Sequence, residues 1–220
     1  MADLKLFHDR VKSGDLASVR TMLAEDPALL DMRNEGGQPA FLLASYYQQA
    51  EIAAYLLSLK PRLDIHLATV AGDLGEVLGA LDKDGALLES HSSDGWTPLH
   101  LAAFFGRLNV AEALVARGAN VDARSTNNMR NTPLHAAAAG RKTQLCRFLL
   151  EHGANANAAQ AGGWTALHGA AQNGDRELVE VLLAHHADLQ ARAENNQTPL
   201  DLALLRGHQE VADLLGQLSD

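Results

Sequence analysis

The sequence predicts an all-α protein made of repeated pairs of short helices, and two observations support this prediction. The tetrapeptide Thr-Pro-Leu-His, or a close variant of it, begins at Thr97, Thr132, Thr165 and Thr198, at intervals of 35, 33 and 33 residues. A fixed period of this length is typical of stacked repeat architectures. Aromatic residues make up only 5% of the chain, while Ala and Leu are abundant, which suits closely packed helices better than a β-sandwich.

The first helix of each repeat is expected to begin at the tetrapeptide. Thr97 stands where an N-cap is needed, because its hydroxyl accepts a hydrogen bond from a free N–H of the first turn. Pro98 follows at the first helical position, where its missing N–H costs nothing. Glycines that tolerate a left-handed backbone mark the turn after this helix: Gly106, Gly174 and Gly207.

The second helix of each repeat is expected to bury one apolar face. Val110, Leu114 and Val115 follow the 3.6-residue period of such a face, and Leu145, Leu149 and Leu150 repeat it, as do Leu178, Leu182 and Leu183. Gly118 and Gly153 are expected to end the helix in a left-handed conformation, and His186 takes that place in the next copy at some conformational cost. A short hairpin finger then leads into the next repeat.

The order of these residues resembles the ankyrin-repeat family, strongly from Asp94 onward. The run Gly95-Trp96-Thr97-Pro98-Leu99-His100-Leu101-Ala102-Ala103, with Gly-Ala-Asn at 118–120, fits the family pattern, and Gln38-Pro39 and Ile65-His66-Leu67-Ala68 look like diverged copies. The resemblance implies an ankyrin-repeat solenoid of about seven helix–turn–helix units with short β-hairpin fingers. We expect one domain over residues 1–220, with units at 1–33 (N-terminal cap), 34–60, 61–91, 92–126, 127–159, 160–192 and 193–220 (C-terminal cap).

The N-terminal half also repeats on its own terms. The segment that starts at Gly14-Asp15-Leu16 parallels the segment that starts at Gly72-Asp73-Leu74, an offset of 58 residues. Only Ser58 to Arg62 separates the helices of the second and third units, which is too short for a full finger. We therefore expect a gap in the row of fingers at this point, together with a bend.

Composition excludes several classes of function. Eighteen basic and 27 acidic residues give a net charge of -9, which argues against nucleic-acid binding and against anionic membrane surfaces. The N-terminus has no apolar core of signal-peptide length, and no stretch approaches the ~20 apolar residues of a membrane span. A single cysteine cannot form an internal disulfide. We expect a monomeric, cytoplasmic protein.

The sequence contains no recognisable catalytic, metal or cofactor motif, so neither an enzyme nor a bound cofactor is expected. The resemblance implies that His100, His135 and His168 join a hydrogen-bond network between neighbouring repeats, with the Thr of each motif as the local partner. Successive helix layers would hold them about 10 Å apart, too far to share one metal ion. Cys146 matches small or apolar residues in the other copies and is expected to be buried.

Function is expected at the positions that the fold leaves free, which in the family are the fingertips and the outward side of the first helices. The candidate partner-binding residues are Trp96, Phe104, Phe105, Arg107, Met129, Arg130, Asn131, Arg141, Trp164, Gln172, Asn173 and Gln197. Large aromatic side chains at such places are candidate hot spots, although both tryptophans are equally suited to packing on a neighbouring finger.

One finger is longer than the others. Ten residues separate Asp122 from Thr132, against eight in the two following copies, so the tip at Ser125–Arg130 is expected to protrude, either as a specificity element or as a tolerated insertion. The chain is thus predicted to be a protein–protein interaction scaffold that binds its partner with the concave face and fingertips. A structural or self-associating repeat protein, and an enzyme or metal protein that uses the histidines, remain the alternatives.

Overall fold

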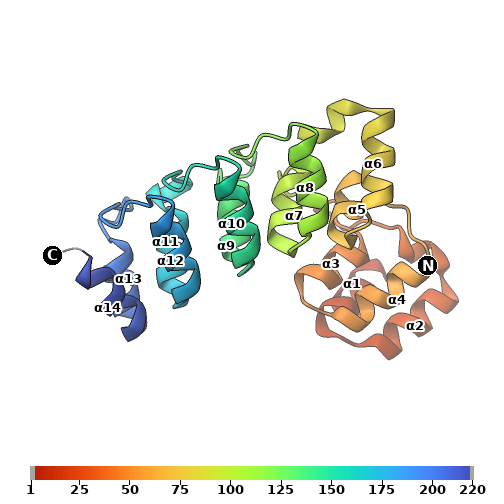
Figure 1. The fold of residues 1–220 in the computed structure, drawn as a ribbon. Helices are drawn as coiled ribbons and strands as arrows, with labels where there is room; N and C mark the ends of the chain where they lie inside the picture. The colour runs from red at the N-terminus through yellow and green to blue at the C-terminus, as the bar shows by residue number, and fades with distance from the viewer. Residues whose placement is uncertain (1–2, 219–220) are drawn as a thin grey trace.

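The computed structural model describes residues 3–218, which form an elongated all-α solenoid with its first and last helices far apart (Figure 1). Its α-helices are α1 Leu4–Ser13, α2 Leu16–Glu25, α3 Ala40–Tyr46, α4 Ala50–Ser58, α5 Ile65–Ala71, α6 Leu74–Lys83, α7 Pro98–Phe105, α8 Leu108–Ala116, α9 Pro133–Ala139, α10 Thr143–Glu151, α11 Ala166–Asn173, α12 Arg176–Ala184, α13 Pro199–Arg206 and α14 Gln209–Gln217. Consecutive helices form antiparallel pairs. Odd-numbered helices stack on one another in one row, and even-numbered helices stack in a second row.

The helices begin where the sequence predicts. Thr97 and Thr198 cap α7 and α13, and a proline occupies the first turn of each. The second helices of several pairs are capped by aspartate instead: the Asp15, Asp73 and Asp175 carboxylates accept from the backbone N–H three residues on. These caps satisfy donors that have no partner within the helix.

The turn between paired helices uses a left-handed residue, as predicted. Gly106, Gly174 and Gly207 have φ of 72°, 66° and 74°. The turn between α9 and α10 also has a left-handed residue, but it is not the glycine. Arg141 has φ of 54°, while Gly140 has φ of −75°. A Cβ at Gly140 would collide with the carbonyl oxygen of Phe104 on the neighbouring helix. Glycine is therefore required at 140 for close packing and not for its backbone freedom.

The fingers are tight turns without strands in the described part of the chain, where the one isolated β-bridge joins Arg33 and Pro39. Each finger closes on itself through a backbone bond, such as Gln160 N to Trp164 O at 2.8 Å. Neighbouring fingers are also joined by backbone bonds, such as Glu194 N to Gly162 O at 2.9 Å. A finger this short has room for one such pair, so the expected β-hairpins do not extend into ladders.

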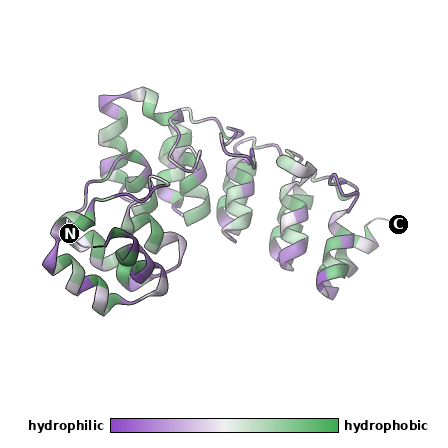
Figure 2. Ribbon diagram, turned by 180° about the vertical axis from the view of Figure 1, so that it is seen from behind, coloured by the Kyte–Doolittle hydropathy of each residue, from purple (hydrophilic) through white to green (hydrophobic). Residues whose placement is uncertain are grey.

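Stacking provides the core. Most helices contain both apolar and polar residues (Figure 2), whereas α3 and α9 are buried over most of their length, and the apolar residues of successive pairs pack together. Buried apolar residues form two clusters, one centred on α1–α4 and the other running from α5 to α14. No pair of helices buries its own apolar face alone, so neighbours stabilise one another in sequence along the array. None of the helices within residues 3–218 combines the length and the hydropathy needed to cross a membrane.

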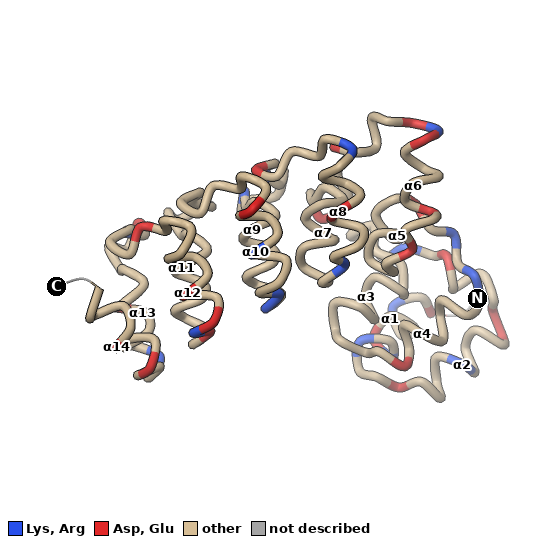
Figure 3. The backbone as a smooth tube through the Cα atoms, in the orientation of Figure 1, with Lys and Arg blue, Asp and Glu red and all other residues tan. Residues whose placement is uncertain are grey.

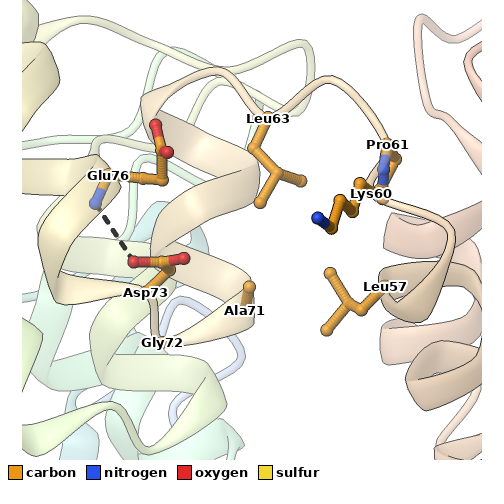
Figure 4. A pocket seen from close by; sticks show the side chains of 8 residues that line it. All are labelled: Leu57, Lys60, Pro61, Leu63, Ala71, Gly72, Asp73 and Glu76. Atoms are coloured by element: carbon orange, nitrogen blue, oxygen red, sulfur yellow. Dashed lines mark hydrogen bonds between the residues drawn. The ribbon is translucent and has the colours of Figure 1, made fainter.

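The predicted bend lies between the second and third helix pairs, where α1–α4 are tilted against α7–α14 (Figure 1). On the side of the even-numbered helices this seam is open, as a hollow of about 660 Å³ in which Leu57 and Lys60 lie across from Ala71 and Asp73 (Figure 4). No finger fills the space, because the linker from α4 to α5 is too short to form one.

On the side of the fingers, the finger between the second and third units is missing, as expected, but the row itself is closed. The side chain of Gln38 donates to Asp94 Oδ1 at 2.8 Å, and the Tyr46 hydroxyl donates to Asp94 Oδ2 at 3.0 Å. The finger of the second unit therefore contacts the finger of the fourth unit directly. The missing finger is compensated by the bend itself, which closes the row of fingers as it opens the opposite side.

Candidate functional site

A groove lies on the finger side of α7, α9 and α11, with a volume of about 340 Å³. We call it the central groove. Seven of the twelve predicted residues line it: Trp96, Phe104, Met129, Asn131, Trp164, Gln172 and Asn173. An adjoining hollow of similar volume shares Met129, Trp164 and Gln172 with it. The floor of the central groove is made of small residues of α9 and α11, namely Ala138, Ala139 and Gly169, which leave room above the helices.

Aromatic rings build one end of the central groove. Phe104 packs edge-on against Trp96, with ring centroids 5.2 Å apart, and lies 5.1 Å from Phe105. Phe105 continues the contact to Tyr46 of α3 at 5.2 Å. Burial and the neighbouring Asp94 carboxylate raise the pKa of Tyr46, so its hydroxyl remains a donor to Asp94. Predicted residue Phe105 therefore supports this wall from behind.

The long finger lies across the middle of the row and does not project freely. Thr126 N donates to Gly95 O at 2.9 Å, and Asn127 Nδ2 donates to Asp94 O at 2.8 Å. On the other side, Ala161 N donates to Met129 O at 2.8 Å. This tip therefore bonds to both neighbouring fingers, as the following finger also does through Ala161 N and Gly162 O. The expected protruding tip is thus held at both sides, and Met129 is 50% exposed beside the central groove.

The motif histidines hold the fingertips in place, as the sequence predicts. His100 Nε2 contacts Asn131 O at 3.0 Å, His135 Nε2 contacts Trp164 O at 3.1 Å, and His168 Nε2 contacts Gln197 O at 3.1 Å. In each case Nδ1 accepts from the backbone N–H of the Thr that begins the same motif. The proton of the neutral imidazole therefore resides on Nε2 and is donated to the next finger.

Burial keeps these imidazoles neutral. It lowers the pKa of His100 and of His135 to about 4, and it lowers the pKa of His168 in the same direction. Desolvation penalises the charged ring, and protonation of Nδ1 would remove the acceptor that the threonine uses. The histidines thus act as structural hydrogen-bonding groups that set the position of three predicted site residues.

The remaining predicted residues lie around the central groove or away from it. Arg130 is exposed on the long finger next to Met129. The Arg141 guanidinium donates to Asn173 O at 2.9 Å, at the far end of the groove. Arg107 is used in stacking, because its Nε donates to Val70 O at 2.8 Å. Gln197 lies on the next finger, where its backbone carbonyl accepts from His168.

The sequence analysis missed one polar lining residue of the groove, Gln160, and two residues that support its aromatic wall from outside, Tyr46 and Asp94. Tyr46 occupies the last turn of α3, as Phe104 and Phe105 occupy the last turn of α7, and this correspondence was the signal available. Gln160 lines the groove from the following finger, whose next residue, Ala161, donates its backbone N–H to Met129 O. The bridging role of Asp94 had no signal in the sequence, because it depends on two fingers that meet across the seam.

Cys146 is buried within α10, as predicted. Burial and the Asp175 charge raise the pKa of its thiol to about 12. The reactive thiolate is therefore scarce at neutral pH, and the side chain behaves as a small apolar residue.

The fold and the groove define a class of protein. Helix pairs stacked in two rows, with fingers along one edge and free side chains gathered beside them, make a repeat solenoid with an extended surface of the kind such proteins use for binding. The chain belongs to the ankyrin-repeat family. The family's sequence model, described as ankyrin repeats in three copies, matches residues 7–125, 65–160, 120–193 and 157–219.

Individual relatives are similar over part of this chain. Protein phosphatase 1 regulatory subunit 27 of Mus musculus is 29% identical over 118 residues, 54% of this chain and 60% of the relative. A Transient receptor potential cation channel subfamily A member 1 homolog of Caenorhabditis elegans is 31% identical over 126 residues, 53% of this chain and 10% of the relative. The human regulatory subunit 27 is 39% identical over 59 residues, 27% of this chain and 38% of the relative. Each match spans less than two thirds of the relative's length.

Proposed function

We propose that the chain is a non-catalytic protein–protein interaction scaffold that receives its partner in the central groove. The observation that carries the proposal is the gathering of seven predicted residues, from three fingers and two helices, around one hollow. Family membership supports a binding role, and one similar protein is named as a regulatory subunit of a phosphatase.

The groove has the make-up of an interaction hot spot. Large aromatic side chains and an exposed methionine surround a floor of small residues, and such anchors dominate binding free energies in protein interfaces. The histidine bonds and the finger-to-finger bonds hold the walls in place before a partner arrives. A prearranged surface loses less conformational entropy on binding.

Intrinsic fluorescence provides the test, because both tryptophans of the chain, Trp96 and Trp164, line the groove. Peptides are first selected from a randomised displayed library against the full chain. Their binding is expected to change the tryptophan emission. The double substitution Phe104→Ala with Met129→Ala is expected to weaken binding by about 2 kcal/mol or more, as hot-spot truncations do, with helicity retained in circular dichroism.

The matched control is Tyr47→Ala, which truncates an aromatic side chain that is 52% exposed and does not line the groove. This variant is expected to bind as the unchanged chain does. If the selected peptides bind without altering the emission, and the double variant retains full affinity, the groove is not the binding site and the proposal is wrong.

A further inference from the structure

We infer that the occupant of the central groove is an extended peptide segment whose bulky apolar side chain is flanked by acidic residues. The inference rests on the proposed function and names the chemistry of the partner. Three features of the groove carry it: an unpartnered buried amide, an apolar hollow, and an excess of unpaired basic side chains.

The first feature is the side chain of Asn131. The residue is only 7% exposed, lines the groove, and its Oδ1 has no hydrogen-bond partner within residues 3–218. Its backbone cannot move to find one, because the Asn131 carbonyl is held by His100 Nε2. Burying an unpaired polar group is unfavourable, so such a group at a groove wall indicates a missing partner.

A peptide backbone supplies the partner that this amide needs. The carboxamide offers an acceptor oxygen and a donor NH2 group, and a peptide group offers the matching N–H donor and C=O acceptor. An extended segment exposes its backbone N–H and C=O groups, whereas a helix has already paired them. Oδ1 is fully covered in this geometry, so Asn131 bonds the main chain of an extended occupant once its carboxamide turns toward the groove.

The second feature is the hollow beside Asn131. Trp96, Phe104 and Trp164 surround it, and its volume is about 340 Å³. This volume lies at the lower end of the range for ligand pockets. With these walls, the hollow is suited to a large apolar side chain that projects from the extended segment.

The third feature is local charge. The chain as a whole carries -9, yet residues 123–174, which contribute most of the groove, contain one acidic residue, Glu151. The same stretch contains five basic residues: Arg124, Arg130, Arg141, Lys142 and Arg147. Within the described residues none of these five forms an ion pair.

Two of these cations flank the groove. Arg130 is exposed beside Met129 on the long finger, and Arg141 bonds the carbonyl of Asn173 at the opposite end. Lys142 follows Arg141, so two consecutive basic residues occupy the turn between α9 and α10, which is blue in Figure 3. Acidic side chains on both sides of the apolar anchor would meet these charges, which gives complementarity and faster association.

The charge test uses the randomised peptide library and the full chain. Selected sequences are expected to be rich in Asp and Glu around an aromatic or large aliphatic residue. The double reversal Arg130→Glu with Arg141→Glu is expected to weaken the selected peptide roughly tenfold. The control Arg147→Glu changes an exposed, unpaired cation of the same stretch on α10, outside the groove lining, and is expected to leave affinity unchanged.

The backbone test uses Asn131→Ala. Removing an unpaired buried amide is expected to leave the free energy of unfolding in urea unchanged or higher, while peptide affinity falls about tenfold. A variant that loses stability and keeps its affinity would show that the amide serves the fold and would overturn its assigned role.

The two proposals fail in different ways. Selected peptides that are neutral or basic, or that bind equally well after charge reversal, overturn the acidic occupant even when they still alter the tryptophan emission. Oligothymidylate that binds through the same arginines with comparable affinity overturns it in favour of a nucleic acid. Peptides that leave the emission unchanged and tolerate the Phe104→Ala, Met129→Ala double substitution disprove the groove itself.

Discussion

At the scale of single residues, the motif histidine joins one repeat to the next through a neutral ring. His100 and His135 each accept from a threonine on one ring nitrogen and donate to the next finger with the other. The arrangement works for one tautomer and one charge state only. The proton equilibrium of these rings is therefore coupled to folding.

We predict that the protein loses stability as the pH falls from about 7 to about 5. Burial lowers the folded pKa of His100 and His135 to about 4, while the unfolded chain binds protons near pH 6.5. Their contribution is complete above the unfolded pKa, declines as the pH falls through this window, and levels off below the folded pKa. The loss is on the order of 2 kcal/mol for each ring between these two pH values, measured by urea denaturation.

The control for this prediction is His152→Gln, which alters an exposed histidine of α10. It is expected to leave the pH profile unchanged, whereas His100→Gln is expected to flatten it. Stability that stays constant or rises on acidification across the window would contradict the role assigned to the buried rings.

At the scale of helices, close approach depends on small residues at particular places. Gly140 lies against the carbonyl of Phe104. The next residue, Arg141, adopts the left-handed conformation that a glycine adopts in the turns at Gly106, Gly174 and Gly207. The inverted order brings α9 close to α7. It also places the Arg141 guanidinium at Asn173, at the end of the central groove.

We predict that Gly140→Ala destabilises the protein by roughly 1–3 kcal/mol, because the added methyl group collides with backbone that has little freedom to move. Gly79→Ala is the matched control, since a Cβ at that helical position in α6 meets nothing within 4 Å. It is expected to stabilise by about 0.5–1 kcal/mol through helix propensity. Urea denaturation of both variants gives the comparison, and equal effects would refute the packing argument.

At the scale of the whole molecule, the seam after α4 divides the core. The cluster of α1–α4 extends across it through Leu67, Val70 and Leu101. Asp94 also joins the second and fourth units by accepting from Gln38 and Tyr46. Repeat arrays lose cooperativity where the interface between neighbours is weak. The seam is the place where this array is expected to separate into two folding units.

We predict that Asp94→Ala lowers the stability of α1–α4 by about 1–3 kcal/mol, because two donors lose a charged acceptor. Hydrogen exchange is expected to rise in α1–α4 and to stay unchanged in α9–α14. The control Glu112→Ala removes an exposed acid of α8 and is expected to have an effect within about 0.5 kcal/mol. Uniform acceleration of exchange along the chain would refute a division at the seam.

Much of the candidate site was predictable, because the repeat puts equivalent residues at equivalent places. Counting from Thr97, Thr132 and Thr165 was enough to identify Trp96, Trp164 and half of the residues that line the groove. Arg107 was predicted for the site on the same grounds, but its side chain bonds Val70 and supports the stack. The direction that a long side chain takes depends on the neighbouring repeat, which a count along one repeat does not include.

The sequence alone determined the repeat, the ends of its helices and the pairing of each threonine with its motif histidine, because these depend on residues three or four positions apart. Capping, left-handed turns and the threonine–histidine pair are local, and each copy repeats them. Contacts between copies were decided only by the tertiary structure. The closure of the fingers over the seam through Asp94, the attachment of the long finger to both neighbours, and the unpaired amide of Asn131 all depend on segments about 30 to 60 residues apart.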